Sequence, residues 1–260
     1  MSKQRLSKVL AAAGVASRRA CEEIIFSGQV KVNDQIIKTP QTLVDLKLDR
    51  VLVRNAPIQK IEEKVYYILN KPVGYICSTR GNSQSKLVLE LFQNEGHRLF
   101  TVGRLDKDTS GLLLVTNDGH FANRVIHPSA NINKEYLVKT DQEVTHEHLV
   151  AIGHGTLVEG VFVKPIKVEK VRRGTVKVII GEGKKREVRL LLDAAGLKIK
   201  SLSRIRVGGL LLGTLPVGSW RSLTENEKKM IFSQHSTEES YTSTTNAQSL
   251  GKKNKKEKPS

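Results

Sequence analysis

Cysteine, tryptophan and long apolar runs are scarce in this chain of 260 residues. Its two cysteines, Cys21 and Cys77, lie far apart, and neither belongs to a Cys-x-x-Cys pair or a Cys/His cluster. This pattern indicates neither a zinc site nor a disulfide framework. No apolar run has the length of a transmembrane helix, and no basic amphipathic anchor is evident. These absences predict a protein without a bound metal and without a membrane partner.

Acidic residues are in deficit as well. The chain carries 43 Lys and Arg against 26 Asp and Glu, a formal net charge of +17. Such an excess attracts polyanions and accelerates their encounter with the protein, so nucleic acid is the expected partner. The first residues, MSKQRLSKVLAAAG, contain only a short apolar stretch interrupted by Lys8. No signal peptide is therefore predicted, and we expect a cytoplasmic protein.

The first 53 residues have the pattern of a small module of two helices and several short strands. Apolar residues recur at helical spacing over residues 4–13. Ser17 is a good N-cap for a second helix, which Gly28 ends. Residues 30–53 then show the alternation of short strands, with an Asn-Asp turn at 33–34.

The stretch 102–119, VGRLDKDTSGLLLVTNDG, combines a polar loop with a short buried strand. Its glycines, arginine and aspartates precede the apolar run 112–115, and Asn-Asp-Gly at 117–119 is a strong turn signal. Loops held by a rigid scaffold are common places for catalytic groups. An Asp beside an Arg in a loop is, however, most often a surface ion pair of little energetic consequence. The spacing alone leaves both interpretations open.

Motifs spread over the chain give it a resemblance to the RNA pseudouridine synthases. GRLD at 103–106, followed by TSGLL at 109–113, resembles the aspartate motif of that family. NKPVG at 70–74 and the GxLxxGxWRxLT pattern at 213–224 are similar to further family motifs, within the branch typified by RsuA and RluB and nearer to RluB. The order RLSKVLAAAGVASRR…GQVKVNDQ resembles the S4 RNA-binding domain over nearly all of residues 3–53.

This resemblance implies an α+β fold with two domains. A small S4-type α/β RNA-binding module would precede a synthase domain with a mixed, mostly antiparallel sheet and peripheral helices. We predict the first domain at residues 1–56, a linker at 57–63, the catalytic domain at 64–232 and a disordered basic tail at 233–260. The tail combines low hydrophobicity with dense charge, which does not offset the entropy cost of folding. The protein is expected to act as a monomer without a cofactor.

The resemblance also implies three catalytic residues. Asp106 is the expected catalytic aspartate, either as a nucleophile or as the base that removes a sugar proton. Tyr136, in a Lys-x-Tyr motif on a strand-like segment, would face this aspartate and help to remove the proton from C5. Arg189 follows a basic loop and would hold Asp106 ionised and oriented. The family usually carries Gln where this chain has Glu187.

Ten basic residues are expected to contact RNA, mainly through phosphate groups that supply affinity and register rather than sequence recognition. Five belong to the S4-like elements and would form one cationic face. Arg104 would enter the space left by a displaced uridine or bind a phosphate. GEGKKR at 181–186 does not match GxxxxGK[ST], so nucleotide binding is not predicted there. The expected contacts are Arg5, Lys8, Arg18, Arg19, Lys31, Lys71, Arg104, Lys184, Lys185 and Arg186.

The predicted function is the isomerisation of uridine to pseudouridine in ribosomal RNA, and nearness to RluB favours the large subunit. The alternatives are a small-subunit enzyme, a non-catalytic S4-type RNA-binding or ribosome-assembly factor, and a nucleosidase. Asp108 and Asp118 compete with Asp106 as catalytic carboxylates. A glycosidase-like pair of Asp106 and Asp108 would need a defined separation, which two residues this close in a turn rarely achieve.

Overall fold

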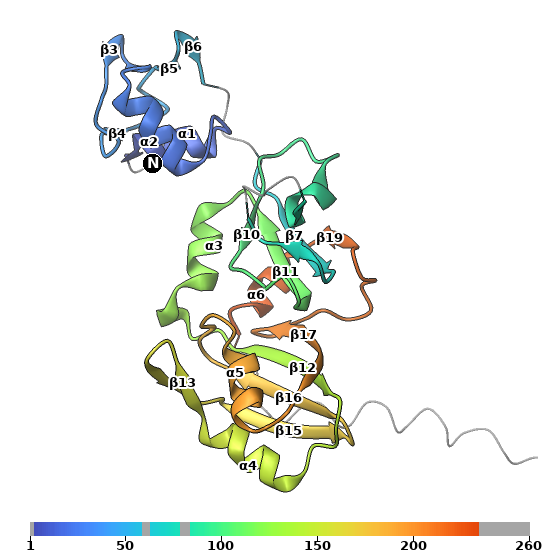
Figure 1. Ribbon diagram of the computed structural model, residues 1–260. Helices are drawn as coiled ribbons and strands as arrows, with labels where there is room; N and C mark the ends of the chain where they lie inside the picture. Colours follow the sequence, from blue (N-terminus) through green and yellow to red (C-terminus); the bar gives the residue numbers. More distant parts are fainter. Residues whose placement is uncertain (1–2, 59–62, 79–83, 234–260) are drawn as a thin grey trace, which may run out of the picture.

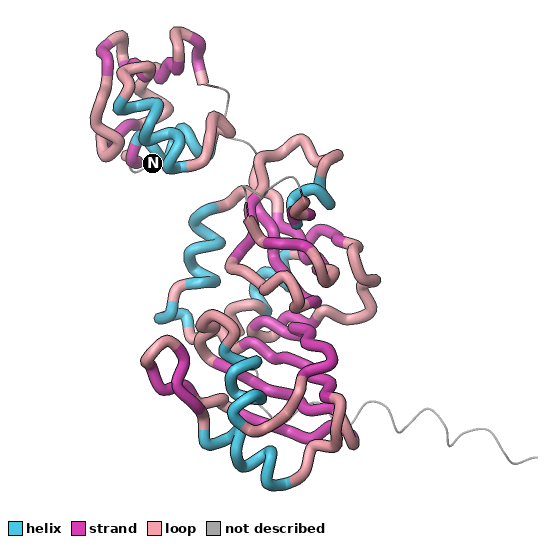
Figure 2. The backbone as a smooth tube through the Cα atoms, viewed as in Figure 1, coloured by secondary structure: helices cyan, strands magenta, loops and turns pink. Residues whose placement is uncertain are grey.

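The computed structural model describes residues 3–58, 63–78 and 84–233, which form a small N-terminal domain at one end of a larger second domain (Figures 1 and 2). In the described part of the chain no helix is long and apolar enough to cross a membrane. The predicted tail lies, apart from Ser233, outside these residues. The helices are α1 (Leu6–Ala12), α2 (Arg18–Phe26), α3 (Gly119–Ile126), α4 (His146–His154), α5 (Glu187–Ala194) and α6 (Glu225–Met230), with the 3-10 turns η1 (Val88–Phe92) and η2 (Pro128–Ala130).

The N-terminal domain follows the predicted order of two helices and short strands. Ser17 caps α2, because its hydroxyl accepts a hydrogen bond from the Ala20 N–H at 3.2 Å. The apolar sides of both helices pack on the strands around Leu10 and Ile25, which are fully buried. The strands are β1 (Gln4–Arg5), β2 (Val30–Val32), β3 (Gln35–Ile36), β4 (Leu43–Val44), β5 (Val51–Val53) and β6 (Ala56–Pro57).

The N-terminal domain continues past its predicted end at residue 56, because its last hairpin includes Pro57 and Ile58. Residues Arg54 and Asn55 both have positive φ and form a turn that returns the chain onto β5. Pro57 is therefore in β6, and the Ile58 N–H donates to the Val51 carbonyl at 3.2 Å. The predicted linker began at Pro57 because a proline among polar residues suggested a break, whereas proline is tolerated in an edge strand. Positions 59–62 of that linker lie outside the described residues.

The second domain is built on one large sheet of order β15-β16-β12-β17-β11-β7-β19, with β10 paired to β11 and β18 to β17. Only β11 and β17 run parallel among the paired strands of this sheet, so the predicted mixed, mostly antiparallel sheet is confirmed. The strands of this domain are β7 (Tyr66–Lys71), β8 (Tyr75–Ile76), β9 (Lys86–Leu87), β10 (Phe100–Val102), β11 (Ser110–Thr116), β12 (Lys134–Thr140), β13 (Thr156–Val158), β14 (Val161–Val163), β15 (Lys167–Arg172), β16 (Thr175–Ile180), β17 (Ile199–Val207), β18 (Leu210–Leu211) and β19 (Trp220–Ser222).

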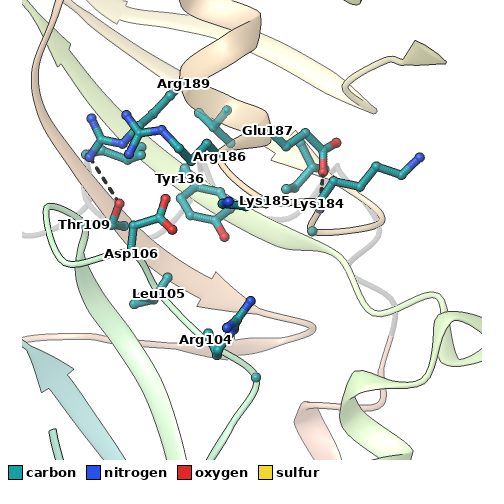
Figure 3. A pocket seen from close by; sticks show the side chains of 15 residues that line it. Arg104, Leu105, Asp106, Thr109, Tyr136, Lys184, Lys185, Arg186, Glu187 and Arg189 are labelled. Atoms are coloured by element: carbon teal, nitrogen blue, oxygen red, sulfur yellow. Dashed lines mark hydrogen bonds between the residues drawn. The ribbon is translucent and has the colours of Figure 1, made fainter. Parts of the chain in front are cut away.

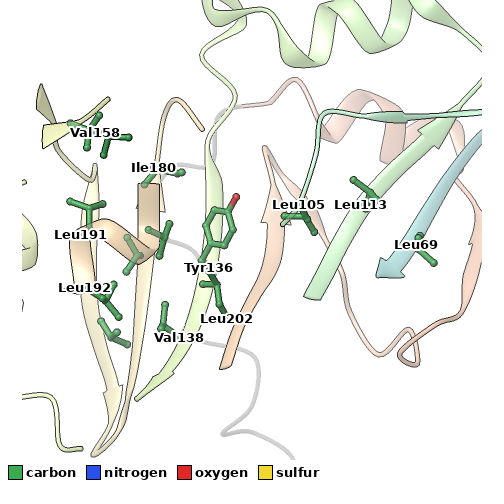
Figure 4. Packing of buried hydrophobic residues seen from close by; sticks show 14 of the residues in the cluster. Leu69, Leu105, Leu113, Tyr136, Val138, Val158, Ile180, Leu191, Leu192 and Leu202 are labelled. Carbon is green, nitrogen blue, oxygen red and sulfur yellow. The ribbon is translucent and has the colours of Figure 1, made fainter. Parts of the chain in front are cut away.

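The apolar run of β11 is buried on both faces of this sheet. Leu112 and Leu114 pack with α3 on one face, whereas Leu113 and Val115 belong to a larger core on the other face, which α4 and α5 cover (Figures 1 and 4). A fully buried leucine contributes roughly 1.5–3 kcal/mol through the hydrophobic effect. The uninterrupted run of four apolar residues is thus explained, because neither face of this strand meets solvent.

The sheet brings three polar segments to one place. The loop between β10 and β11, residues 103–109, leaves the sheet beside β12, and the loop between β16 and α5 reaches the same region. Gly111 permits this arrangement, since its φ is +103° and an added Cβ would lie 2.2 Å from the Arg204 carbonyl on β17. The close parallel approach of β11 and β17 therefore requires glycine at this position.

Candidate active site

A cavity of about 280 Å³ lies between the loop 103–109, strand β12 and the start of α5 (Figure 3). It brings together all three residues predicted to be catalytic, which come from distant parts of the chain. The Asp106 carboxylate is turned toward the ring of Tyr136, as Figure 3 shows. The polar and charged residues that line the cavity are Arg104, Asp106, Thr109, Tyr136, Lys184, Lys185, Arg186, Glu187 and Arg189.

Lys71 holds the loop that carries Asp106 and does not face solvent. Its side chain is fully buried at the end of β7, and Nζ donates to the carbonyls of Pro72, Asp106 and Thr109 at 3.0, 3.1 and 2.8 Å. Burial lowers the pKa of this ammonium group. The predicted contact of Lys71 with RNA is therefore wrong, because the buried ammonium group donates to carbonyls of the protein itself. A buried lysine requires such acceptors, and here main-chain carbonyls supply them.

Arg189 contacts Asp108 rather than Asp106. Its Nη2 atom lies 3.1 Å from Asp108 Oδ2 and donates to the Asp108 carbonyl at 2.9 Å and to Thr109 Oγ1 at 3.2 Å. Arg189 therefore does not contact the Asp106 carboxylate as predicted. Its guanidinium group instead reaches Asp108, two residues farther along the loop. Its Nε is buried and has no hydrogen-bond partner within the described ranges. Unsatisfied buried donors of this kind are unusual and often occur at functional sites.

The Asp106 carboxylate itself accepts no hydrogen bond and forms no ion pair with any residue that the structure describes. Its main-chain carbonyl, in contrast, accepts hydrogen bonds from Lys71 Nζ and from the Thr109 N–H, each at 3.1 Å. Tyr136 is 8% exposed and belongs to β12, where it contributes to the main core as well as to the cavity wall. A half-exposed carboxylate beside an aromatic ring can therefore meet a base that enters the cavity.

Positive charge surrounds the rim of this cavity. Arg104, Lys185 and Arg186 are exposed, and Lys184 is half-buried with its Nζ 3.5 Å from Glu182. Arg186 has φ 57°, a left-handed conformation uncommon for a side chain of its size, and lies 3.6 Å from Asp108. Apart from Lys71, the residues of this domain that are predicted to contact RNA thus surround one opening. A polyanion bound there would meet several hydrogen-bond donors.

Glu187, the position that the family usually fills with Gln, shapes the basic loop. Its carboxylate is buried and accepts a hydrogen bond from the Lys184 N–H at 2.8 Å. Burial raises the pKa of this carboxyl group. A glutamine oxygen would accept the same hydrogen bond, so the role visible in the structure does not depend on the charge.

The two competing carboxylates have structural partners. Asp118 caps α3 by accepting from the N–H groups of His120 and Phe121, and it also binds Tyr66 and Lys64. Burial acts to raise the pKa of Asp118, but the hydrogen bond from Lys64 and the cap outweigh it, and the pKa is lowered. Asp108 is exposed and paired with two arginines. Asp106 is therefore the carboxylate of this loop that faces the cavity.

The cations predicted on the N-terminal domain have the exposure that RNA contact requires. Arg5, Lys8, Arg18 and Arg19 are exposed and Lys31 is half-buried. A hydrogen bond connects the two domains: Nη1 of Arg98, in the second domain, donates to the Ala16 carbonyl of the first at 2.8 Å.

Sequence patterns missed several residues of the site. Asp108 was treated as a competitor of Asp106, although it is the partner of Arg189. Lys134 and Arg204 were assigned no role, yet both line a second cavity beside the first. The only signal in the sequence was their place in strand-like segments, where charged residues usually face solvent. In the described part of the chain no cluster of three or more His, Cys, Asp or Glu side chains is arranged for a metal ion.

Comparisons with known proteins relate both domains of the chain to known families. The family model described as RNA pseudouridylate synthase matches residues 65–194, and that of the S4 domain matches residues 4–53. A solved structure described as a pseudouridylate synthase superimposes with a TM-score of 0.63 at 31% identity, covering 88% of this chain and 99% of that chain.

Two named relatives extend the similarity along the chain. Ribosomal large subunit pseudouridine synthase B of Bacillus subtilis is 37% identical over 88% of this chain and 95% of its own length. SVR1 of Arabidopsis thaliana, a chloroplastic protein named as a candidate ribosomal large subunit pseudouridine synthase, is 45% identical over 88% of this chain. The match spans 60% of that plant protein.

Proposed function

The chain belongs to the RNA pseudouridylate synthase family, in its branch with an N-terminal S4 domain, and we propose that it isomerises a uridine of large-subunit ribosomal RNA. The choice of the large subunit is supported by the names of the Bacillus subtilis and Arabidopsis thaliana relatives. The high positive charge of the chain supports RNA of considerable size as substrate.

The reaction breaks the N1–C1′ bond of uridine, turns the base, and forms a C5–C1′ bond. A proton leaves C5 and N1 gains one, so the product is an isomer of the substrate. In our proposal Asp106 is the catalytic carboxylate, acting either as a nucleophile at the ribose or base, or as the base that removes a sugar proton. Both roles need a carboxylate with at least one oxygen that can reach the substrate.

The observation that carries this proposal is the Asp106 carboxylate, which points into the cavity toward Tyr136 and accepts no hydrogen bond from the described residues. The conformation of its loop is held from behind by Lys71, and Arg189 holds the following residues through Asp108. We assign Arg189 a positioning role by this route. A reactive group that is already oriented needs no reorganisation at the moment of reaction, which favours catalysis.

Tyr136 is proposed to contact the extruded base and to take part in removing the C5 proton. A target nucleotide must leave its stack to reach the cavity, which costs a few kcal/mol and less where the RNA is already unpaired. The cations around the opening, Arg104, Lys184, Lys185 and Arg186, would bind the flanking phosphates. The N-terminal domain would add phosphate contacts that fix the register of the enzyme on the RNA.

The test is pseudouridine mapping of ribosomal RNA in cells that lack this protein and in the same cells complemented with wild type or with Asp106→Asn. We expect one large-subunit site to vanish and to return only with the wild type. Asp106→Asn should bind RNA with unchanged affinity, while pseudouridine formation by the purified variant falls by at least about a hundredfold.

Two other outcomes would change the proposal. A vanished site in small-subunit RNA would retain the chemistry and overturn the assignment of the substrate. Every site could instead persist in cells that lack the protein, while ribosome assembly is impaired and is restored by Asp106→Asn. The chain would then be an RNA-binding assembly factor and not an enzyme.

A further inference from the structure

A second, larger cavity of about 510 Å³ adjoins the first and is not used by the chemistry described above. The two cavities share the residues Gly103, Arg104, Tyr136, Gly183 and Lys184, so they lie next to one another on either side of these residues. The volume falls in the range of about 300–1,000 Å³ that is usual for small-molecule sites.

One wall of this cavity is apolar and rigid. It is formed by side chains of β10, β11, β17, α3 and the segment before β12, and most of them are buried in the core under α3. These side chains are Val102, Leu114, Val125, Ile126, Ile132 and Val207. Apolar side chains of this kind can accept the face of a base, because every base has a π-face.

The polar side of the cavity offers cations. Arg204 is only 7% exposed, and its Nε donates to the Leu112 carbonyl at 2.8 Å. Lys134 is half-buried, and its Nζ donates to the Gly181 carbonyl at 3.0 Å. Burial and the neighbouring positive charge of Arg204 both lower the pKa of Lys134. Within residues 3–58, 63–78 and 84–233, neither cation forms an ion pair with a carboxylate.

Two neighbouring cations without a carboxylate partner are costly in a partly desolvated site, and an acceptor from a ligand relieves that cost. We propose that this cavity binds the nucleotide next to the target uridine, with its base on the apolar wall and its acceptor oxygens toward Lys134 and Arg204. The proposal rests on the proposed function, since it treats the smaller cavity as the place of the target uridine.

The adjacency of the two cavities favours an adjoining nucleotide over an unrelated small anion. Arg104 and Lys184 line both spaces, so a chain that leaves the first cavity passes these cations before it enters the second. Single-stranded RNA is commonly recognised in this way, with unstacked bases held in neighbouring pockets and their edges hydrogen-bonded. The second cavity would therefore select the sequence context of the modified uridine.

The test compares Lys134→Met with Lys139→Met, which changes an exposed lysine of the same strand. The substrate is an RNA hairpin carrying the site found by mapping. We expect Lys134→Met to raise KM about tenfold or more, as for loss of a hydrogen bond to a charged group, with kcat nearly unchanged. Lys139→Met should leave both constants within about twofold of the wild type, because its side chain is outside the cavity.

Substrate changes then locate the ligand. Hairpins are prepared with an abasic residue, or with an uncharged methylphosphonate linkage, at each position flanking the uridine. At one position, one of these changes should abolish the KM difference between wild type and Lys134→Met. If the abasic residue abolishes it, Lys134 contacts the base at that position. If the methylphosphonate linkage abolishes it, Lys134 contacts the phosphate. If the difference persists with every modified hairpin, Lys134 does not meet a flanking nucleotide and the inference is overturned.

A second variant tests the proposal even if Lys134→Met does not fold. Ile126 is 53% exposed at the cavity wall, so Ile126→Trp should fill the space without disturbing the core. It should also raise KM, and a KM equal to that of the wild type would contradict the proposal. Failure of the proposed function is distinguishable, because the wild type would then form no pseudouridine in any hairpin.

Discussion

The two domains use their positive charge differently. On the N-terminal domain Arg18 and Arg19 are exposed, and the contact of Arg18 with Glu22, at 3.8 Å, is a surface pair of small energetic value. In the catalytic domain Lys71 and Arg204 are buried and donate to main-chain carbonyls, and the half-buried Arg206 pairs with the buried Glu135 at 2.9 Å. The first domain leaves these cations exposed to solvent, whereas the second uses several to stabilise its own structure.

The comparison shows that residue type alone does not identify an RNA contact. A buried ammonium or guanidinium group must be satisfied by the protein, because removing it from water without acceptors costs several kcal/mol. Lys71 is satisfied by three carbonyls and therefore acts on the Asp106 loop. Exposed cations carry no such penalty and remain available to phosphate groups.

The largest expected contrast between the domains is in stability. Lys71→Met removes a buried cation that donates to three carbonyls, so we expect the free energy of unfolding of the catalytic domain to fall by about 2–4 kcal/mol. Activity should fall with it, because the Asp106 loop is no longer held. Lys8→Met, the matched change of an exposed lysine on α1, should alter stability by less than about 0.5 kcal/mol. Calorimetry of both variants measures the change in the free energy of unfolding.

Equal and small effects of the two lysine substitutions on stability would contradict this difference between the domains. The acceptor carbonyls would then be satisfied by water, and Lys71 would not be needed to hold the loop. A retained activity in Lys71→Met would point to the same conclusion.

A smaller effect is expected on RNA binding. The double variant Arg18→Gln with Arg19→Gln should lower the slope of log Kd against log salt by about 0.7–0.9 for each phosphate group that is no longer neutralised, while kcat at saturating RNA stays unchanged. Lys198→Gln with Lys200→Gln, two exposed lysines of the catalytic domain outside both cavities, is the matched control. An identical slope in the two double variants would show that the N-terminal cations are merely solvated.

The smallest expected effect concerns pH. Arg221 binds Glu227 through two hydrogen bonds of 2.7 and 2.9 Å, and these chiefly lower the pKa of Glu227 to about 2. A depressed carboxyl pKa adds stability above the ordinary value of about 4.3, and this is lost as the pH falls toward 2. Because Arg221 is 44% exposed, we expect about 1 kcal/mol or less.

Thermal unfolding at about pH 6 and about pH 3, on either side of the ordinary carboxyl pKa, measures this contribution. The melting temperature of the wild type should fall further between these pH values than that of Glu227→Gln. Glu23→Gln, which changes an exposed carboxylate on α2 of the first domain, should behave as the wild type. A Glu227→Gln protein with the acid sensitivity of the wild type would show that the pair is screened by solvent.

Local patterns predicted most of the secondary structure. Helix α1 lies within the predicted residues 4–13, strands β2 to β5 lie within the predicted residues 30–53, and the predicted Ser17 cap of α2 is present. Alternation, glycine at helix ends and capping residues act within a few positions of the chain, so the sequence contains the whole signal. The β5–β6 hairpin was missed because its short edge strand has too few residues to show a period.

Partners across the site were predicted less well. Asp106 and Tyr136 do face one cavity, as the motifs indicated, but Arg189 pairs with Asp108 and Lys71 is buried. Those outcomes depend on distances between segments that are far apart in the chain, to which local periodicity is insensitive.

The sequence by itself determined the order of the elements, the two-domain plan and the chemistry-bearing residues, because helix caps, alternation and motif spacing are local properties. The tertiary structure decided which charges meet water and which meet a carbonyl. It also joined the Lys134 and Arg204 cavity to the Asp106 cavity through shared walls. The physical reason is desolvation, since the same lysine or arginine binds a partner inside or outside the protein according to how much of it the packed sheet covers.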